Sequence, residues 1–374
     1  MPAQSSDTLA LQPAARVTEL QQGPTAHKTY RLIQVLRAIA AEMVVVRHAT
    51  TLLHLRDPRD FSIWNNGVTG VDIFFVISGF VMIISTAPLL GSAHPARTFF
   101  ARRAERIAPM YWLASTAKVL ALFAAPTIAV VGLGRWWHVL GSYLFFPTRS
   151  PIGAYGSVLA VGWTLIFEMF FYVLFAIVLA TRLPRLPVLA PVLILLAFAR
   201  TIPFVERHGT LHFYANTMQL EFLFGMLLAT SIPRARKIPG SLAILLGIAG
   251  FVPLLLWNPP LAVLWGGILW GVPALAVVTA AVALESPFGA RAPRWLLEIG
   301  DASYSIYLVH GFVVPVVGIL FARFGGRGPY ILPLALMAAI IVATVAGDLV
   351  YRLIERPMIE WFRGRRRAAI PANA

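Results

Sequence analysis

The chain has 374 residues, of which 58% are hydrophobic and only 13% charged, and it contains no cysteine. A soluble globular domain carries about 25% charged residues, so the composition excludes an ordinary soluble domain and predicts an all-α polytopic membrane protein. The absence of cysteine excludes disulfides, thiolate catalysis and cysteine-bound metals. The formal net charge is +15, and we expect it to reflect membrane topology rather than nucleic-acid binding.

Residues 1–28 are polar and rich in Pro and Gln, without the apolar core of a signal peptide, and we predict a disordered cytoplasmic tail. A transmembrane helix needs about 20 mostly apolar residues. By this length, we predict that residues 29–358 form one bundle of about ten transmembrane helices. The predicted spans lie near residues 32–53, 67–89, 109–131, 158–180, 188–204, 213–231, 241–257, 261–283, 303–322 and 331–353. The stretch 134–147 is too short to span and offers Trp136 and Trp137 as interfacial anchors.

Basic residues are distributed unequally between the loops on the two sides of this bundle. With a cytoplasmic amino terminus, the inner loops hold Lys28, Arg31, Arg97, Arg102, Arg103, Arg106, Arg182, Arg185, Arg234, Arg236, Lys237, Arg291 and Arg294. Residues 359–374 add a basic tail on the same side, and the outer loops hold fewer basic residues. The positive-inside rule therefore places both termini in the cytoplasm, where the charges also attract anionic membrane lipids.

The first predicted span contains Arg37, Glu42, Arg47 and His48, which are unfavourable in hydrocarbon. Arg37 and His48 are eleven residues apart, so on an α-helix they share one face within about 20° and lie roughly 16 Å apart. Ionisable groups inside a span usually face the bundle interior and mark a functional pathway. Two ordinary explanations stay open: Arg37 can extend to the headgroups, and His48 can form an interhelical hydrogen bond. We expect Glu42 to neutralise a nearby arginine.

Two further segments carry polar residues between apolar ones. The second span opens with "GVTGVDIFFVISGFVM", which contains Asp72, a supporting residue among small ones that favour close helix packing. The predicted loop 97–112 carries Arg103 and Arg106, which are neighbours wherever that segment is helical. Because planar guanidinium groups suit phosphate recognition, this pair is a candidate anion site.

The later spans add a carboxylate and a second histidine. Glu168 lies in the aromatic span segment 162–175, where a buried carboxylate needs a partner. The ninth span begins with "DASYSIYLVHGF" (301–312), which contains Tyr307 and His310. We expect His310 at the cytoplasmic end of its helix, either beside the basic loop or as a structural residue.

Taken in order, these segments resemble the membrane-bound acyltransferase family 3, and within it the bacterial exopolysaccharide O-acetyltransferases. The resemblance covers about residues 29–358. It rests on the Arg37/His48 pair, "GVDIFFVISGF", the Arg103/Arg106 pair running into "RIAPMYW", "GWTLIFEMFFY" and "SYSIYLVH". The chain departs from the family at the fourth span, where Thr164 and the single Glu168, followed by Met169, replace a serine and paired acids. Many relatives carry an additional esterase-like domain; this chain shows none, so we expect the bundle to perform the whole transfer.

The resemblance implies an O-acyltransferase of the bacterial inner membrane. Its donor is acyl-coenzyme A, with acetyl favoured, and its acceptor is a hydroxyl of a polysaccharide or of a lipid-linked precursor, with polysaccharide-synthesis machinery as a further partner. By the same resemblance, Arg37, Arg103 and Arg106 hold the donor and His48 is the catalytic histidine. The helix geometry agrees, because a cationic mouth and an imidazole roughly 16 Å deeper suit the phosphates and the thioester. No metal and no permanently bound cofactor are expected.

Acyl transfer to a hydroxyl needs a base, and imidazole is the commonest one. His48 either deprotonates the acceptor or carries the acyl group itself, and both routes stay open. We expect Glu168 to orient or charge-balance the imidazole, and Tyr307 and Trp163 to be candidate oxyanion donors. Two other functions fit the sequence less fully. A secondary transporter or flippase for an oligosaccharide or lipid-linked intermediate uses the same residue types, and a scaffold subunit needs no alignment of Arg37 with His48.

Overall fold

The computed structural model describes residues 30–56, 62–124, 135–258, 262–324 and 330–368. Within these ranges the chain is almost entirely helical, which confirms the all-α prediction. The exception is a short antiparallel pair of strands, β1 (Thr148–Arg149) and β2 (Tyr155–Gly156). The predicted tail 1–28 lies outside the described residues, as do residues 369–374 of the predicted basic tail.

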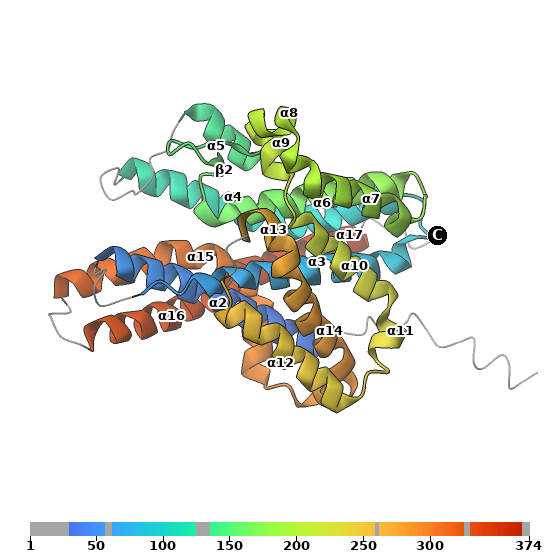
Figure 1. Cartoon of the computed structure of the whole chain (residues 1–374). Coiled ribbons are helices and arrows are strands. Elements are labelled where there is room, and N and C mark those ends of the chain that lie inside the picture. The colour runs from blue at the N-terminus through green and yellow to red at the C-terminus, as the bar shows by residue number, and fades with distance from the viewer. Residues whose placement is uncertain (1–29, 57–61, 125–134, 259–261, 325–329, 369–374) are drawn as a thin grey trace, which may run out of the picture. The chain divides into compact units, whose positions relative to one another are not determined.

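Figure 1 shows the helices of this bundle. The longer ones are α2 (Arg31–Arg56), α3 (Gly70–Thr86), α4 (Pro95–Ala124), α6 (Trp163–Ala180), α7 (Arg185–Phe198), α10 (Gln219–Thr230), α12 (Gly240–Leu256), α14 (Gly271–Phe288), α15 (Arg294–Phe324), α16 (Ile331–Val350) and α17 (Arg356–Ala368). The shorter ones are α5 (Trp136–Tyr143), α8 (Pro203–Arg207), α9 (Gly209–Tyr214), α11 (Ile232–Ala235) and α13 (Ala262–Leu269). A π-helical turn, Tyr351–Glu355, joins α16 to α17.

Six helical segments of the described ranges are long and apolar enough to cross a membrane. They are Asn65–Leu89, Pro95–Ala124, Ala160–Ala180, Trp265–Arg291, Arg294–Phe321 and Ile331–Arg366. The 26-residue α2 is long enough, but its ionisable residues set it apart from these six. Helices α7, α10 and α12 have 14, 12 and 17 residues, fewer than the about 20 that a span needs. The described residues therefore support six of the about ten predicted spans by length and composition.

The predicted loop 97–112 is wrong, because this segment is the first part of the 30-residue helix α4. Its Ala, Arg and Glu residues are strong helix formers, and Pro95 stands at the first helical position, where proline is favoured. Pro109 lies inside the helix without ending it, as neighbouring helices allow in membrane bundles. Arg103 and Arg106 are therefore one helical turn apart on a rigid element rather than on a loop.

Close packing of α3 against α10 depends on two glycines. A Cβ atom added to Gly79 of α3 would overlap the backbone carbonyl of Phe222 in α10, and one added to Gly225 of α10 would overlap that of Val76 in α3. This confirms the expected role of small residues in the second span, which is to let backbones approach closely. In the same bundle, α15 packs along both α2 and α16.

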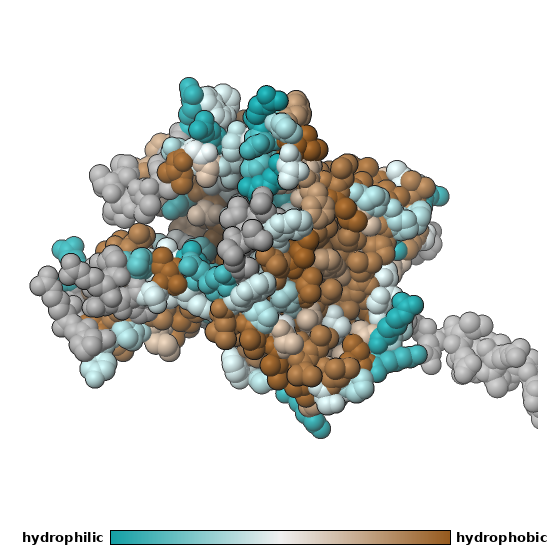
Figure 2. All heavy atoms as spheres, viewed as in Figure 1, coloured by the Kyte–Doolittle hydropathy of each residue, from teal (hydrophilic) through white to brown (hydrophobic). Residues whose placement is uncertain are grey.

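Apolar side chains also cover much of the outside of the bundle. Figure 2 shows them over α7, α10, α12 and α14 on the face in view. The exposed apolar residues of α12 include Leu242, Leu245, Ile248 and Val252. Exposed apolar area on this scale is typical of a surface that faces lipid rather than water.

Candidate active site

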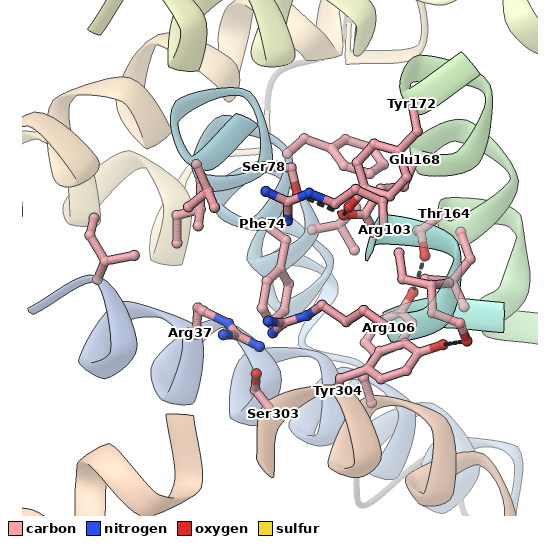
Figure 3. Close-up of a pocket in the computed structure, with 18 of the residues that line it drawn as sticks. Arg37, Phe74, Ser78, Arg103, Arg106, Thr164, Glu168, Tyr172, Ser303 and Tyr304 are labelled. Carbon is pink, nitrogen blue, oxygen red and sulfur yellow. Dashed lines mark hydrogen bonds between the residues drawn. The ribbon is translucent and has the colours of Figure 1, made fainter. Parts of the chain in front are cut away.

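Helices α2, α3, α4, α6 and α15 line a cavity of about 220 Å³. Its lining includes all three predicted donor-binding arginines, Arg37 of α2 with Arg103 and Arg106 of α4, together with Glu168 of α6 (Figure 3). Hydroxyl groups complete the polar lining, from Ser78, Thr164, Tyr172, Ser303, Tyr304 and Tyr307. The structure thus brings five predicted site residues, Tyr307 of α15 included, from four helices to one cavity.

The two arginines that meet at the centre of this cavity lack a carboxylate partner at contact distance. Figure 3 shows the guanidinium groups of Arg37 and Arg106 side by side. Arg37 donates a hydrogen bond to Gln34 Oε1 at 3.1 Å. Among the described residues, no ion pair within 4.0 Å involves either of these arginines or Arg103. Because adjacent cations repel each other, this arrangement favours an anionic ligand.

Arg103 is held more firmly than the other two arginines. Its Nη2 donates to Ser85 Oγ at 2.5 Å, and its guanidinium lies 5.8 and 5.7 Å from the ring centres of Phe99 and Tyr172. A guanidinium over aromatic rings gains cation–π attraction. Arg103 is therefore oriented before any ligand binds.

Glu168 joins α3 to α6 at the wall of the cavity. Its Oε1 accepts a hydrogen bond from Ser78 Oγ at 2.9 Å and another from the Tyr172 hydroxyl (Figure 3). No hydrogen bond of the described residues links Glu168 to His48, so the expected contact between them is not formed. The reason is geometric: α6 presents Glu168 to the arginine end of α2, and His48 lies about 16 Å further along that helix.

His48 lies instead beside His310 of α15. Nε2 of His310 is 3.3 Å from Nδ1 of His48, and the ring centres are 4.9 Å apart. The prediction that His310 accompanies the basic loop is wrong, because α15 begins at Arg294 rather than near residue 303. Position 310 is consequently about 24 Å from the start of its helix, deep enough to meet His48.

Neither histidine belongs to the lining of the arginine cavity. Tyr307 stands between the two features, because it lines the cavity and its ring centre lies 5.8 Å from that of His310. The expected single lumen shared by Arg37 and His48 is therefore not found among the described residues. The arginine cavity and the histidine pair are adjacent, with an aromatic side chain separating them.

The other predicted residues take structural positions. The Tyr307 hydroxyl donates to the Val161 carbonyl at 3.0 Å and lies 2.8 Å from Thr164 Oγ1, so its proton already has an acceptor. Trp163 packs edge-on against Phe167 with ring centres 6.1 Å apart and does not line the cavity. Because Tyr307 lines the cavity and Trp163 does not, Tyr307 is the better placed of the two candidate oxyanion donors, although its proton is bonded to the Val161 carbonyl in this structure.

Asp72 also lies outside the cavity lining. Only 1% of its surface is exposed, and its carboxyl group interacts with that of Glu221 on α10, which is fully buried. The sequence placed Asp72 at the opening of the second span among small residues, but it gave no sign of this partner. Among the described residues, no hydrogen bond or ion pair joins Asp72 to the cavity arginines or to the two histidines, so the structure gives no support to its predicted supporting role.

Glu42, on α2, accepts a hydrogen bond from Thr344 of α16 at 2.8 Å. Among the described residues it forms no ion pair with an arginine, so its predicted neutralising role is wrong. Packing explains the difference, because α2 presents this position to α16, and the three cavity arginines lie on α2 itself and on α4.

Two residues near the arginines were given no role from the sequence. The Ser303 hydroxyl lines the cavity, is fully buried and has no hydrogen-bond partner in the part of the chain that the structure describes, which leaves it free for a ligand. Glu355 is 1% exposed, accepts a hydrogen bond from Ser305 Oγ at 2.6 Å, and its charge acts on Arg106 and Arg37. A helical pattern does not predict its direction, because the π-helical turn shifts the register there.

Comparisons with known proteins agree on one family. The profile of the acyltransferase domain matches residues 31–352. The exopolysaccharide production protein ExoZ of Rhizobium meliloti (strain 1021) is 36% identical over 312 residues, which cover 80% of this chain and 92% of that protein. No solved structure matches the chain.

Two more distant relatives carry names that state a reaction. The putative peptidoglycan O-acetyltransferase YrhL of Bacillus subtilis (strain 168) is 26% identical, with 86% of this chain and 54% of that protein covered. The O-acetyltransferase OatA of Staphylococcus aureus (strain NCTC 8325 / PS 47) is 25% identical, with 79% and 53% covered. The chain thus spans about half the length of these two proteins. On the extent of the profile match and the similarity to ExoZ, the chain belongs to the acyltransferase domain family, as its motifs predicted.

Proposed function

We propose that the protein is an integral-membrane O-acyltransferase that moves an acyl group, acetyl by preference, from cytoplasmic acyl-coenzyme A to a hydroxyl of a cell-surface or exported polysaccharide. The observation that carries this proposal is the cavity lined by Arg37, Arg103 and Arg106, none of which is paired at contact distance with a carboxylate of the described residues. The similarity to an exopolysaccharide production protein and to O-acetyltransferases supports the acceptor class and the reaction.

The arginines suit the phosphate end of the donor. Coenzyme A carries several phosphate charges, and guanidinium groups bind phosphate through paired, charge-assisted hydrogen bonds. The hydroxyl of Ser303, which has no partner among the described residues, supplies one more donor to such a ligand. Glu168, held by its two neighbours on α3 and α6, keeps this wall of the cavity in place.

The reacting end of the donor must then reach the histidine pair. Tyr307 and Phe74 both line the cavity on this path, with ring centres 6.3 Å apart. Tyr307 is the cavity residue in ring contact with His310, with ring centres 5.8 Å apart. Our proposal therefore requires that Tyr307 moves when the donor binds, since the cavity lining does not include His48.

His48 supplies the base. Its Nε2 accepts the proton of the acceptor hydroxyl while the hydroxyl oxygen bonds to the acyl carbon, the carbon–sulfur bond breaks, and the coenzyme A thiolate then takes that proton from His48. In the second route, Nε2 bonds to the acyl carbon and the carbon–sulfur bond breaks, which releases the coenzyme A thiolate. The acceptor oxygen then displaces the imidazole from the acyl carbon, and the hydroxyl proton passes to the thiolate. Both routes produce the ester and free coenzyme A.

The proposal includes the orientation inferred from charge. About ten spans with both termini in the cytoplasm place the start of α2, and with it Arg37, on the side of the donor. The protein is then a multi-pass component of the bacterial inner membrane, where its apolar faces contact lipid. Its exported acceptor makes polysaccharide-synthesis machinery a natural neighbour.

The test is transfer by the purified protein in lipid nanodiscs. With labelled acetyl-coenzyme A and de-O-acetylated polysaccharide of the native host, we expect label in the polymer and stoichiometric release of coenzyme A. NMR of cell-surface polysaccharide with and without the gene checks the same reaction in cells. Uptake of an oligosaccharide without any consumption of donor would overturn the proposal in favour of a transporter.

A further inference from the structure

We propose that His310 is a positioning residue that fixes the tautomer of His48, so that Nε2 of His48 is the free base. The inference rests on the proposed function, because it assigns a role within the same reaction. It follows from the contact between ring nitrogens of two histidines on different helices, α2 and α15. The sequence did not predict this contact.

The tautomer of His310 is assigned from its own helix. Its Nδ1 lies 3.2 Å from the backbone carbonyl of Ile306, and a carbonyl oxygen can only accept a hydrogen bond, so Nδ1 carries the proton. In the neutral ring Nε2 is then an acceptor with a free lone pair. This acceptor lies 3.3 Å from Nδ1 of His48.

The same reasoning applies to His48. Its Nδ1 lies 2.9 Å from the Val44 carbonyl, so Nδ1 carries the proton and shares it between that carbonyl and Nε2 of His310. Both acceptors act on one N–H, and together they favour the tautomer in which Nε2 of His48 has a lone pair. Among the described residues, Nε2 of His48 has no hydrogen-bond partner, and the His48 side chain is exposed.

His310 is held where this role requires it. It is fully buried, its ring is 5.8 Å from that of Tyr307, and Ile306, one turn earlier, is also fully buried. A fixed orienting group behind a catalytic imidazole is usually a carboxylate. No carboxylate of the described residues lies within 4.0 Å of either histidine.

A neutral imidazole is the reasonable substitute inside a membrane. An ionised carboxylate at this depth is expensive to desolvate, whereas a second imidazole offers a lone pair without charge. When His48 gains the acceptor's proton on Nε2, its Nδ1–H becomes a stronger donor, and the hydrogen bond to His310 stabilises the imidazolium. The proton returns to the leaving thiolate, and His310 stays neutral throughout.

The experiment compares two variants of His310 in the nanodisc transfer assay. In His310→Gln the amide oxygen stands near the place of Nε2 and still accepts from His48, whereas His310→Leu fills the site without an acceptor. We expect His310→Leu to lower kcat by roughly 10- to 100-fold with the donor KM within about twofold of wild type, since the Val44 carbonyl retains part of the tautomer control. We expect His310→Gln to restore kcat to within about fivefold of wild type. His208→Leu, at an exposed position of the described chain outside the site, is the matched control and should change neither constant.

Equal kcat values for His310→Gln and His310→Leu, or a kcat of His310→Leu within threefold of wild type, would overturn the inference. If His310→Leu fails to fold, judged by size-exclusion chromatography and thermal unfolding, His310→Phe replaces it with a flat ring that lacks an acceptor. Failure of the proposed function gives a different result, because wild-type protein would then release no coenzyme A in the presence of acceptor.

Discussion

Replacing Arg106 by glutamine removes one cation from the arginine cavity while keeping a polar side chain of similar length. A hydrogen bond to a charged group contributes about 1.5–3 kcal/mol, and each 1.36 kcal/mol corresponds to a tenfold change. The donor KM should therefore rise about 10- to 150-fold. Because Arg106 lies at the phosphate end of the proposed site and not beside the histidines, the loss should fall on binding, with little change in kcat.

The assay follows release of coenzyme A by the protein in nanodiscs at varied acetyl-coenzyme A and saturating polysaccharide. Arg102→Gln is the matched control, since Arg102 is exposed on the same helix α4 and lies outside the cavity lining. It removes the same charge and should leave the donor KM within about twofold of wild type. An unchanged donor KM in Arg106→Gln, or an equal rise in Arg102→Gln, would refute the reasoning, because the effect would then be absent or would reflect net charge.

Three further outcomes are expected. His48→Ala should lower kcat at least about 100-fold, the usual contribution of a general base, with expression and membrane insertion intact; transfer at near wild-type rate would show that another group is the base. Glu168→Gln should leave kcat within a few fold of wild type and should not raise the donor KM, because this carboxylate is hydrogen-bonded within the cavity wall and not to His48. A large fall in kcat would show that Glu168 acts on the imidazole of His48. Gly225→Val should lower the thermal unfolding midpoint in detergent, since overpacking costs about 1–3 kcal/mol. Gly91→Ala is the control and should leave the midpoint unchanged, because Gly91 has open space around it. Equal midpoints for the two variants would contradict the close contact of α3 with α10.

Several features of this protein could be predicted because they depend on composition or on one helix alone. The shortage of charged residues predicts a helical membrane protein wherever its helices pack. The spacing of Arg37 and His48 fixes their separation along α2, since a single helix is rigid. Any helix that contains Arg103 and Arg106 likewise makes them neighbours, because they are three residues apart. All three arginines line one cavity in the structure.

Errors arose where a helix boundary or a partner helix decided the outcome. His310 was expected at the end of its helix, but α15 starts earlier and carries it to His48. Glu168 was expected to orient or charge-balance His48, yet the packing of α6 against α3 and α4 places its carboxylate in the lining of the arginine cavity. Asp72 was expected in the second span, but nothing predicted its partner Glu221, which is far away in the chain.

The sequence by itself determined the class of the protein, the charged helix that carries its chemistry and the family to which it belongs. Only the tertiary structure decided which side chains meet: the arginines with Glu168, the two histidines with each other, and Tyr307 between them. The physical reason is that helical periodicity fixes the face on which a residue lies. The helix opposite that face is chosen by close packing across the whole bundle, which no local pattern encodes.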